Sequence, residues 1–246
     1  MQSGERLDTV NDRLRLIQKT DGLTFGTDAL LLAAFIAKPA GSALELGGGS
    51  GIISMLLAAR ERFGSIVCAE VQEDFADLIQ RNVSLNKLED RVRVAHADIR
   101  QTALLGMAGE YDAVFSNPPY MTADSGDACL SEAKNIARHE LFGGIFDFAA
   151  CAARMLKYGG SFYTVYRTDR MMDLLSALRA NRLEPKRMTF VHARASLPPA
   201  MVLTEARLGG KCGLKITRPL ILSEHNANTA DYNYILDNGI FPKDLL

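Results

Sequence analysis

The sequence predicts an α/β fold with a mostly parallel sheet, and three observations lead to this prediction. Short apolar runs alternate with helical patterns between residues 42 and 180. Residues 42–60 read as a strand, a glycine-rich turn and a helix, which is the first unit of a nucleotide-binding α/β fold. Strand patterns at residues 186–192 and 201–207 follow each other without a helix, which indicates an antiparallel pair at the edge of the sheet.

The composition is ordinary for a soluble globular protein. Of the 246 residues, 48% are hydrophobic and 23% are charged, and the formal net charge is −1. Without a global positive field, any contact with nucleic acid has to come from a local basic patch. The N-terminus lacks a signal-peptide core, no apolar run can span a bilayer, and the scattered cysteines have neither CxxC nor metal-ligand spacing. We therefore expect one cytoplasmic domain over residues 1–246, without a metal or a membrane segment.

The N-terminal segment, residues 1–40, leads into the first helix. Residues 8–18 mix polar and apolar positions, so we expect them to lie over another part of the fold. Residues 29–36 are rich in Ala and Leu and predict a helix, with Thr27 or Asp28 as its N-cap.

The glycine-rich turn that follows the strand at residues 42–46 has the features of a cofactor-binding loop. Gly47, Gly49 and Gly51 recur at every second position, whereas a dinucleotide loop has the spacing G-x-G-x-x-G. Glycine permits positive φ angles and a close approach between backbone and ligand. Glu45 stands just before the loop, where its charge would repel a pyrophosphate. A ligand with a positive charge and an amino group fits better, and S-adenosylmethionine carries both.

Two acidic residues follow at the ends of the next two strands. The strand at residues 65–69 ends at Glu70, where a carboxylate is placed to take two ribose hydroxyls. A helix at residues 73–86 and a strand at residues 92–95 then lead to Asp98, which could accept a hydrogen bond from an adenine amino group.

The next strand, residues 111–115, ends in the stretch Ser-Asn-Pro-Pro-Tyr. Two consecutive prolines remove two backbone donors and stop the strand. The side-chain oxygen of Asn117 and the carbonyl of Pro118 can each accept a hydrogen bond, and the ring of Tyr120 offers a stacking surface for a base. These groups suit a flat, amino-bearing substrate.

The rest of the chain first continues this pattern and then loses it. Helices are predicted at residues 146–157 and 169–180, and strands at residues 161–166 and 214–222. The polar stretch at about residues 121–137 is expected to form a flap over the site, and residues 223–246 a loosely held tail.

Together these motifs resemble the class I S-adenosylmethionine-dependent methyltransferases, and within them the amino-group methylators with an N-P-P-[YF] motif. Further segments are similar to the valine-tRNA adenine-N(6)-methyltransferase family, namely Gly26-Thr27-Asp28, Ala137-Arg138-His139-Glu140 and the stretches at 182–187 and 210–215. The resemblance covers residues 12–222. It implies a Rossmann-like class I methyltransferase fold with a mostly parallel seven-stranded sheet and an antiparallel edge hairpin near the C-terminus.

The resemblance also implies roles for individual residues. The methionine end of S-adenosylmethionine would lie near Glu45, Thr27 and Asp28, and the ribose and adenine would be held by Glu70 and Asp98. The close-approach loop would consist of Gly47, Gly49 and Gly51. The catalytic residues would be Asn117, Pro118 and Tyr120, with Asn117 also counted among the residues that contact the cofactor.

The activity that the resemblance implies is methylation of the adenosine just 3′ of the anticodon in a valine tRNA. Contacts with RNA would come from local basic residues, with Arg138, Lys186, Arg187, Arg194 and Lys211 as candidates. The N-P-P-Y motif also suits a ribosomal RNA guanine, a DNA adenine or a protein glutamine. A non-catalytic RNA-binding module stays open as a second class of function.

Overall fold

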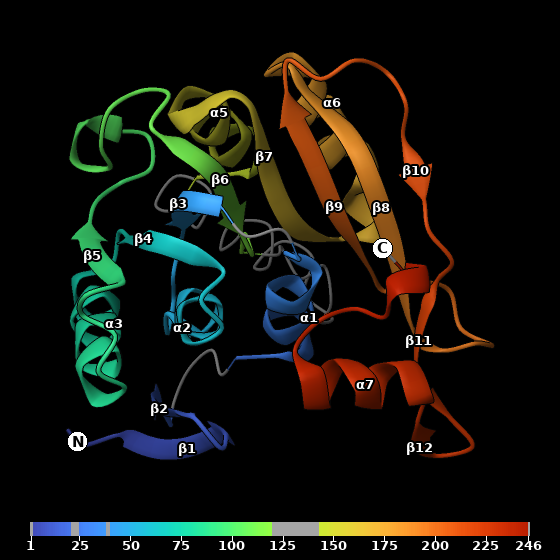
Figure 1. The fold of residues 1–246 in the computed structure, drawn as a ribbon, viewed down its shortest axis with the longest axis horizontal. Helices are drawn as coiled ribbons and strands as arrows, with labels where there is room; N and C mark the ends of the chain where they lie inside the picture. Colours follow the sequence, from blue (N-terminus) through green and yellow to red (C-terminus); the bar gives the residue numbers. More distant parts are fainter. Residues whose placement is uncertain (1, 21–24, 38–39, 120–142, 246) are drawn as a thin grey trace, which may run out of the picture.

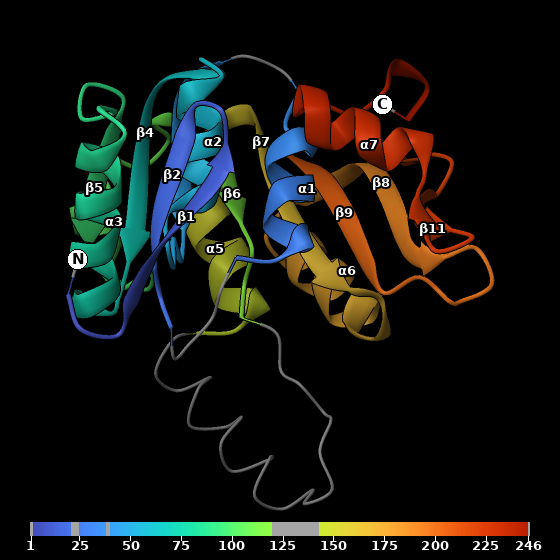
Figure 2. The same ribbon diagram turned by 90° about the horizontal axis from the view of Figure 1, so that it is seen from below.

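The computed structural model describes residues 2–20, 25–37, 40–119 and 143–245. In these ranges a large sheet is covered by helices on both faces, and a separate hairpin lies against the helices of one face (Figures 1 and 2). The predicted flap at residues 121–137 lies outside the described residues, as does Tyr120.

The elements follow the predicted alternation closely. The strands of the large sheet are β3 (Ala40–Leu46), β4 (Phe63–Glu70), β5 (Val92–His96), β6 (Tyr111–Ser116), β7 (Leu156–Arg167), β8 (Leu183–Arg194), β9 (Met201–Leu208), β10 (Lys215–Ile216), β11 (Leu220–Glu224) and β12 (Ala227–Asn228). The helices are α1 (Thr27–Phe35), α2 (Ile52–Ala59), α3 (Glu73–Leu85), α5 (Ile145–Met155), α6 (Met171–Ala180) and α7 (Ala230–Asn238). Short 3-10 turns occupy Thr102–Leu104, Thr168–Arg170 and Lys243–Leu245.

The strand order places a topological switch point between β3 and β6. The sheet runs β12-β11-β8-β9-β7-β6-β3-β4-β5, with β10 attached to β8. From β3 the chain proceeds outward through β4 and β5, and then returns to the other side of β3 with β6. In open parallel sheets, ligands bind beyond the carboxyl ends of the strands at such a point. Here these ends carry the glycine loop and the Asn-Pro-Pro turn.

The antiparallel pair predicted near the C-terminus is formed by β8 and β9. β9 lies between β7 and β8 and is antiparallel to both. β8 is not the outer edge of the sheet, because β10 and β11 pair with it in parallel. The predicted seven-strand arrangement is therefore present and is extended on this side by three short strands.

The core has two parts, one on each face of the sheet. Buried side chains of α1, α2, α3 and α7 pack on one face, and those of α5 and α6 pack on the other. Even-numbered positions of β3 such as Leu44 and Leu46 belong to the α5–α6 side, whereas Ala43 belongs to the α1–α2 side. This alternation follows the period of two in a strand. It also turns Glu45 toward α2.

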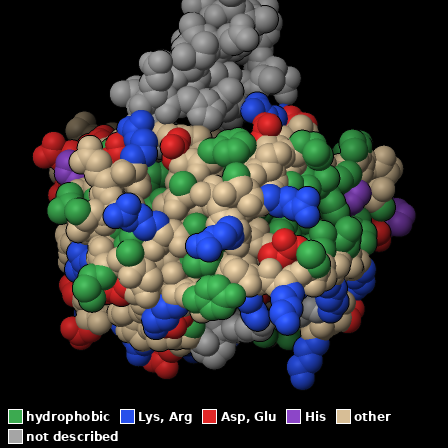
Figure 3. All heavy atoms as spheres, turned by 90° about the horizontal axis from the view of Figure 1, so that it is seen from above, with side chains coloured by type: hydrophobic (Ala, Val, Ile, Leu, Met, Phe, Trp, Pro, Cys, Tyr) green, Lys and Arg blue, Asp and Glu red, His purple; other side chains and the backbone are tan. Residues whose placement is uncertain are grey.

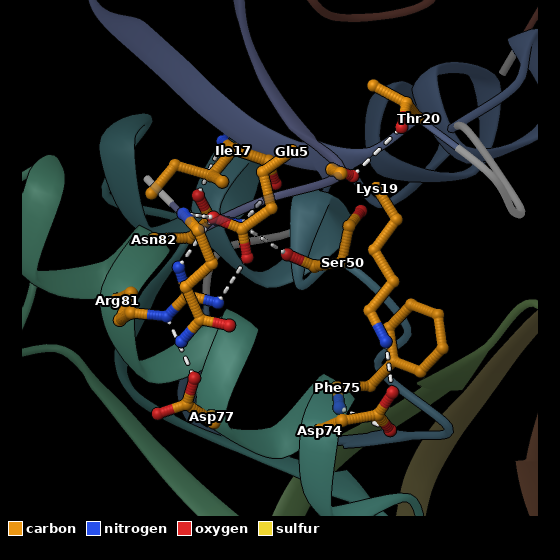
Figure 4. A network of polar contacts seen from close by, with 12 residues as sticks. Glu5, Ile17, Lys19, Thr20, Ser50, Asp74, Phe75, Asp77, Arg81 and Asn82 are labelled. Carbon is orange, nitrogen blue, oxygen red and sulfur yellow. Dashed lines mark hydrogen bonds and ion pairs between the residues drawn. The ribbon is translucent and has the colours of Figure 1, made fainter.

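The N-terminal segment forms the hairpin of β1 (Glu5–Asn11) and β2 (Leu14–Lys19). As expected for residues 8–18, it lies over another part of the fold, with Leu14 and Leu16 fully buried. Asn82 of α3 holds the hairpin, because its Oδ1 accepts from the Ile17 amide at 2.7 Å and its Nδ2 donates to the Ile17 carbonyl at 3.0 Å. Figure 4 shows these contacts beside the ion pair between Glu5 and Arg81.

The prediction of a loosely held tail at residues 223–246 was wrong for the residues that the structure describes. α7 begins at a Thr229 N-cap that accepts from the Tyr232 amide at 3.2 Å, and it ends at Gly239 with a φ of 64°. The side chains of Ile235, Phe241 and Leu245 are buried in the core on the α1 side. Widely spaced apolar residues in a polar, Asn-rich stretch carry too little periodicity to predict this packing.

A buried ion pair joins β8, β9 and α1. Arg187 Nη2 lies 3.1 Å from Glu205 Oε2, and the two side chains are only 12% and 6% exposed. Arg187 also donates to the Phe35 carbonyl at 3.0 Å and lies 3.9 Å from the centre of the Phe35 ring. Arg187 is therefore part of the core, which overturns its assignment as an RNA-contacting residue.

Replacing Arg187 with methionine should destabilise the fold strongly, because Glu205 would lose its charged partner in a desolvated position. Breaking a buried pair costs about 3–5 kcal/mol of unfolding free energy, whereas removing both charges costs far less. Urea denaturation of Arg187→Met and of the double variant Arg187→Met/Glu205→Gln measures this. We expect the double variant to regain most of the loss. A single-variant loss below about 1 kcal/mol would contradict the pair's role.

Candidate active site

The site lies where β3 and β6 end side by side. The Ser116 hydroxyl, fully buried at the end of β6, donates to the Leu46 carbonyl at 2.7 Å. This bond ties the last residue of β3 to the last residue of β6. The glycine loop and Asn117 start from these two points, so the structure brings together the two motifs that the sequence singled out.

The glycine loop is packed against other side chains at Gly48 and Gly51, whereas the space at Gly49 is open. Gly47, Gly49 and Gly51 have φ angles of 71°, 57° and 79°, in the left-handed region that favours glycine. A Cβ at Gly51 would come within 2.8 Å of the Ile79 side chain, and one at Gly48 would collide with the Cys68 sulfur. A Cβ at Gly49 would meet nothing within 4 Å. A ligand can therefore approach the backbone there.

Asn82 connects this loop to the hairpin. Besides holding Ile17, its side-chain amide donates to the Ser50 carbonyl in the glycine loop at 3.2 Å (Figure 4). Asn82 is fully buried. The hairpin, α3 and the loop thus share one hydrogen-bonded support.

Glu70 closes the other side of the loop. Its Oε2 accepts from the Gly49 amide at 2.9 Å, and its Oε1 accepts from the Gln72 amide at 2.9 Å. The residue is 5% exposed. A carboxylate oxygen can accept about two hydrogen bonds, so each oxygen keeps capacity for one more donor, such as a ribose hydroxyl. This geometry fits the role predicted for Glu70.

Glu45 is enclosed between β3, β4 and α2. It is 1% exposed, and its Oε2 accepts from the Ser54 amide at 3.1 Å, from the Ser54 hydroxyl and from the Cys68 thiol at 3.3 Å. Burial raises the pKa of Glu45 to about 7, although these hydrogen bonds lower it. Glu45 would therefore repel a pyrophosphate only weakly, because the carboxyl is enclosed beneath α2 and is partly protonated at neutral pH.

The raised pKa of Glu45 makes stability depend on pH. Between the ordinary value of 4.5 and about 7, the folded state keeps a proton that the unfolded state has lost. The stabilisation is thus complete below pH 4.5 and disappears as the pH rises through 7. Relative to Glu45→Gln, which cannot ionise, the wild type should lose about 2–3 kcal/mol of unfolding free energy between pH 5 and pH 8. Urea titrations at both pH values measure this, and a difference that does not change with pH would refute it.

Asp98 is held by a neighbour two residues along the chain. Its carboxylate pairs with the Arg100 guanidinium at 2.6 Å and accepts from the Arg100 amide at 2.8 Å. These hydrogen bonds hold the pKa of Asp98 below its ordinary value. Asp98 follows the end of β5, at the same edge of the sheet as Glu70. Its contact with an adenine stays a prediction.

Asn117 is placed by the start of α1. Its Nδ2 donates to Asp28 Oδ2 at 2.8 Å, a contact between residues that are 89 positions apart. Its Oδ1 is buried and has no hydrogen-bond partner in the part of the chain that the structure describes. A buried acceptor without a partner is unusual and is a sign of a functional role or of a ligand.

The cap predicted for α1 was wrong. The N-cap is Gly26, without a side-chain cap, and Thr27 and Asp28 are the first two residues of the helix. Asp28 Oδ1 accepts from the Ala29 amide at 2.9 Å, and its other oxygen faces Asn117. The carboxylate is thus used in a long-range contact that local sequence does not reveal. Both Thr27 and Asp28 are half-buried.

Of the remaining predicted catalytic residues, only one is described. Pro118 is buried and follows β6 directly, so it keeps the turn close to the sheet. Tyr120 lies outside the described residues, and its stacking role stays a prediction.

The predicted basic patch is only partly visible. Lys186, Arg194 and Lys211 are accessible to solvent near or on β8 and after β9, and the Lys186 ammonium donates to the Lys211 carbonyl at 2.9 Å. Arg138 lies outside the described residues. Over the face formed by α5 and α6, Lys and Arg side chains are spread among acidic and hydrophobic groups rather than gathered in one place (Figure 3).

Sequence reasoning missed three residues that shape the site, namely Ser54, Asn82 and Ser116. Each is a fully buried polar residue: Ser54 and Ser116 belong to apolar runs, and Asn82 stands between the buried Ile79 and Val83 of α3. Buried polar groups need hydrogen-bond partners, so a polar residue at a core position is a usable signal of a special contact. In this site the partners are Glu45, Ser50 and Leu46.

Neither a metal-binding cluster nor a membrane-spanning helix is present among the described residues. No three His, Cys, Asp or Glu side chains stand close enough together there to hold a metal ion. Among the helices described, none combines the length and the apolar character that crossing a membrane requires.

Comparison with known proteins agrees with this geometry. The family model described as methyltransferase small domain matches residues 19–181. A tRNA1(Val) (adenine(37)-N6)-methyltransferase of Phocaeicola vulgatus is 28% identical over 214 residues, which covers 84% of this chain and 89% of the relative. A protein of the same name from Cronobacter sakazakii is 34% identical over 143 residues, or 57% of each chain.

Solved structures share the fold. A predicted O-methyltransferase from Agrobacterium tumefaciens aligns with a TM-score of 0.71 at 24% identity, covering 87% of this chain and 96% of the other. TYW2 of M. jannaschii, solved in complex with AdoMet, aligns with a TM-score of 0.57 at 15% identity, covering 84% and 87%. The fold class predicted from the sequence is confirmed.

Proposed function

The chain belongs to the methyltransferase small domain family, and from this premise we propose that it methylates the N6 amine of an adenine in tRNA. It is an S-adenosylmethionine-dependent methyltransferase. The substrate that we propose is the adenosine just 3′ of the anticodon in a valine tRNA, the position named for the relatives. The observation that carries the proposal is the buried Oδ1 of Asn117, which has no hydrogen-bond partner among the described residues and lies at the carboxyl end of β6, beside the glycine loop.

The cofactor has a fitting set of residues. We expect the loop of Gly47, Gly49 and Gly51 to lie along it, because the space at Gly49 is open. Glu70 would accept the ribose hydroxyls with its two remaining acceptor positions, and Asp98 would face the adenine. Thr27 would lie near the methionine end. When bound, the cofactor supplies an electrophilic methyl group activated by its sulfonium.

The residues of the Asn-Pro-Pro turn would prepare the amine for attack. The lone pair of an exocyclic amine is delocalised into the ring, which makes the nitrogen a poor nucleophile. Asn117 Oδ1 and the Pro118 carbonyl would each accept one amino hydrogen and draw the nitrogen toward tetrahedral geometry. The lone pair would then form the new N–C bond while the methyl–sulfur bond breaks and its electron pair returns to sulfur, and the surplus proton would leave afterwards to solvent, so no side-chain base is required. Most of the gain is positioning, which can supply about 7–11 kcal/mol in favourable cases.

Reaching the amine requires the base to leave its stack. A nucleotide in an anticodon loop is cheaper to extract than one in a duplex, which favours tRNA over DNA. Tyr120 would stack on the extracted base, and such stacking contributes about 1–3 kcal/mol to binding. Lys186, Arg194, Lys211 and Arg138 are the candidates for backbone contacts. The free thiols of Cys68, Cys151 and Cys212 support a reducing compartment, and we place the reaction in the cytoplasm.

Incubation with methyl-labelled S-adenosylmethionine and separate pools of unmodified tRNA, ribosomal RNA, DNA and protein tests this proposal. We expect label in tRNA alone, and N(6)-methyladenosine after nucleoside digestion. Label in ribosomal RNA guanine, DNA adenine or protein glutamine would replace the proposed substrate. Binding of tRNA without transfer in any pool would identify a non-catalytic module.

A further inference from the structure

The side-chain amide of Asn117 can in principle sit in two orientations. Its oxygen and its NH2 group have nearly the same shape, and a rotation by 180° exchanges an acceptor for a donor. The proposed reaction needs the acceptor at the site, because both hydrogens of the target amine are donors. Something must therefore select one orientation.

Asp28 presents an acceptor to one end of this amide. Its Oδ2 lies 2.8 Å from Asn117 Nδ2, and a carboxylate offers only acceptors. The end of the amide that faces Asp28 has to be the NH2 group, and Oδ1 is left at the opposite end. This Oδ1 is the buried atom without a partner in the described part of the chain. The carboxylate also polarises the amide, which strengthens its oxygen as an acceptor.

Asp28 is itself fixed in place. Its other oxygen, Oδ1, accepts from the Ala29 amide at 2.9 Å. Gly26 leaves the room that the carboxylate needs, because a Cβ there would come within 2.5 Å of Asp28 Oδ1. Gly26 has a φ of −104° and a ψ of 177°, which any residue adopts, so its backbone does not require glycine. Gly26 is therefore explained by the space that the Asp28 carboxylate occupies.

We infer that Asp28 is a positioning residue that holds the amide of Asn117 with its oxygen toward the target amine, and that it thereby selects an amino group over a keto group. This inference rests on the proposed function. It shifts Asp28 from the methionine end of the cofactor to the substrate side. A base with a keto oxygen at the same place would meet another acceptor and be rejected.

The test compares an adenosine anticodon stem-loop with one that carries inosine at the target position, which replaces the amine by a keto oxygen. In Asp28→Asn the new amide can present either end, so Asn117 is free to turn. We expect the kcat for adenosine to fall at least about tenfold, with the affinity for S-adenosylmethionine within about threefold of the wild type. We also expect the preference for adenosine over inosine to shrink about tenfold. This preference is the ratio of the Ki of the inosine stem-loop to the Kd of the adenosine stem-loop.

Gly26→Ala gives a second variant in which the carboxylate is present but displaced. It should show the same two effects. Asp237→Asn, on an exposed position of α7, serves as the charge-matched control and should change neither quantity. Thermal unfolding establishes that the variants are folded.

The outcomes separate the inference from its premise. If the wild type methylates tRNA but both variants keep its kcat and its preference for adenosine, the positioning role is wrong. The same holds if cofactor affinity falls as steeply as kcat, because Asp28 would then belong to the cofactor site. If the wild type methylates no RNA, the proposed function is wrong, and the inference that rests on it is wrong as well.

Discussion

Replacing Asn117 with alanine should abolish most methyl transfer while leaving the cofactor bound. The variant removes the buried Oδ1 acceptor and leaves the Asp28 carboxylate without its amide donor. Removing one preorganised polar group from a catalytic site costs about 10²–10³ in kcat, and we expect a loss in the upper part of that range because the same amide also positions the base. Single-turnover rates with saturating S-adenosylmethionine and a tRNA transcript measure it.

The cofactor affinity of the Asn117→Ala variant is the discriminating quantity. The glycine loop and Glu70 are held by β3, β4 and α3, and these contacts do not involve Asn117. We therefore expect the Kd for S-adenosylmethionine to stay within about threefold of the wild type. Asn238→Ala, on the exposed side of α7, is the matched control. An equal loss of affinity and of rate would show that Asn117 acts through the cofactor and not on the amine.

Replacing Glu70 with glutamine should weaken the binding of S-adenosylmethionine but largely spare the transfer rate at saturating cofactor. A glutamine side chain has one acceptor oxygen, so it cannot accept from both the Gly49 and the Gln72 amides, and its NH2 group would face one of these donors. The variant also loses a charged partner for the ribose hydroxyls. Hydrogen bonds to a charged group contribute about 1.5–3 kcal/mol each, so the Kd for S-adenosylmethionine should rise at least about 100-fold.

Titration calorimetry of Glu70→Gln measures this, with the exposed Glu73→Gln at the start of α3 as the matched control. At saturating cofactor the rate of transfer should recover to within about tenfold of the wild type, because the amine-binding groups are untouched. A Kd within threefold of the wild type would remove Glu70 from the cofactor site.

The sequence predicted the elements of the sheet because their signals are local. Apolar runs of strand length that end in Gly47, Glu70 or Asn117 mark both the strand and its carboxyl end. The carboxyl ends of parallel strands meet at one edge of a sheet, where ligands bind, so a residue at a strand end is a candidate for the site. The roles of Glu70 and the glycine loop could be proposed for this reason.

What the sequence did not reveal depends on contacts between distant positions. Asp28 looked like a helix cap because an acidic residue before an Ala-rich helix usually is one, and nothing local points to Asn117. Glu45 was expected to act on a ligand through its charge, since the sequence does not show that Ser54 and Cys68 enclose it. The packing of α7 depends on three apolar residues separated by polar ones.

The most direct test of the proposed reaction uses two valine tRNA transcripts that differ in a single base, adenosine or guanosine at the position just 3′ of the anticodon. With methyl-labelled S-adenosylmethionine and wild-type protein, we predict one methyl group per adenosine transcript, recovered as N(6)-methyladenosine, and no label in the guanosine transcript. Equal label in both transcripts, or a methylated nucleoside other than N(6)-methyladenosine, would contradict the assignment of the amine that Asn117 is proposed to hold.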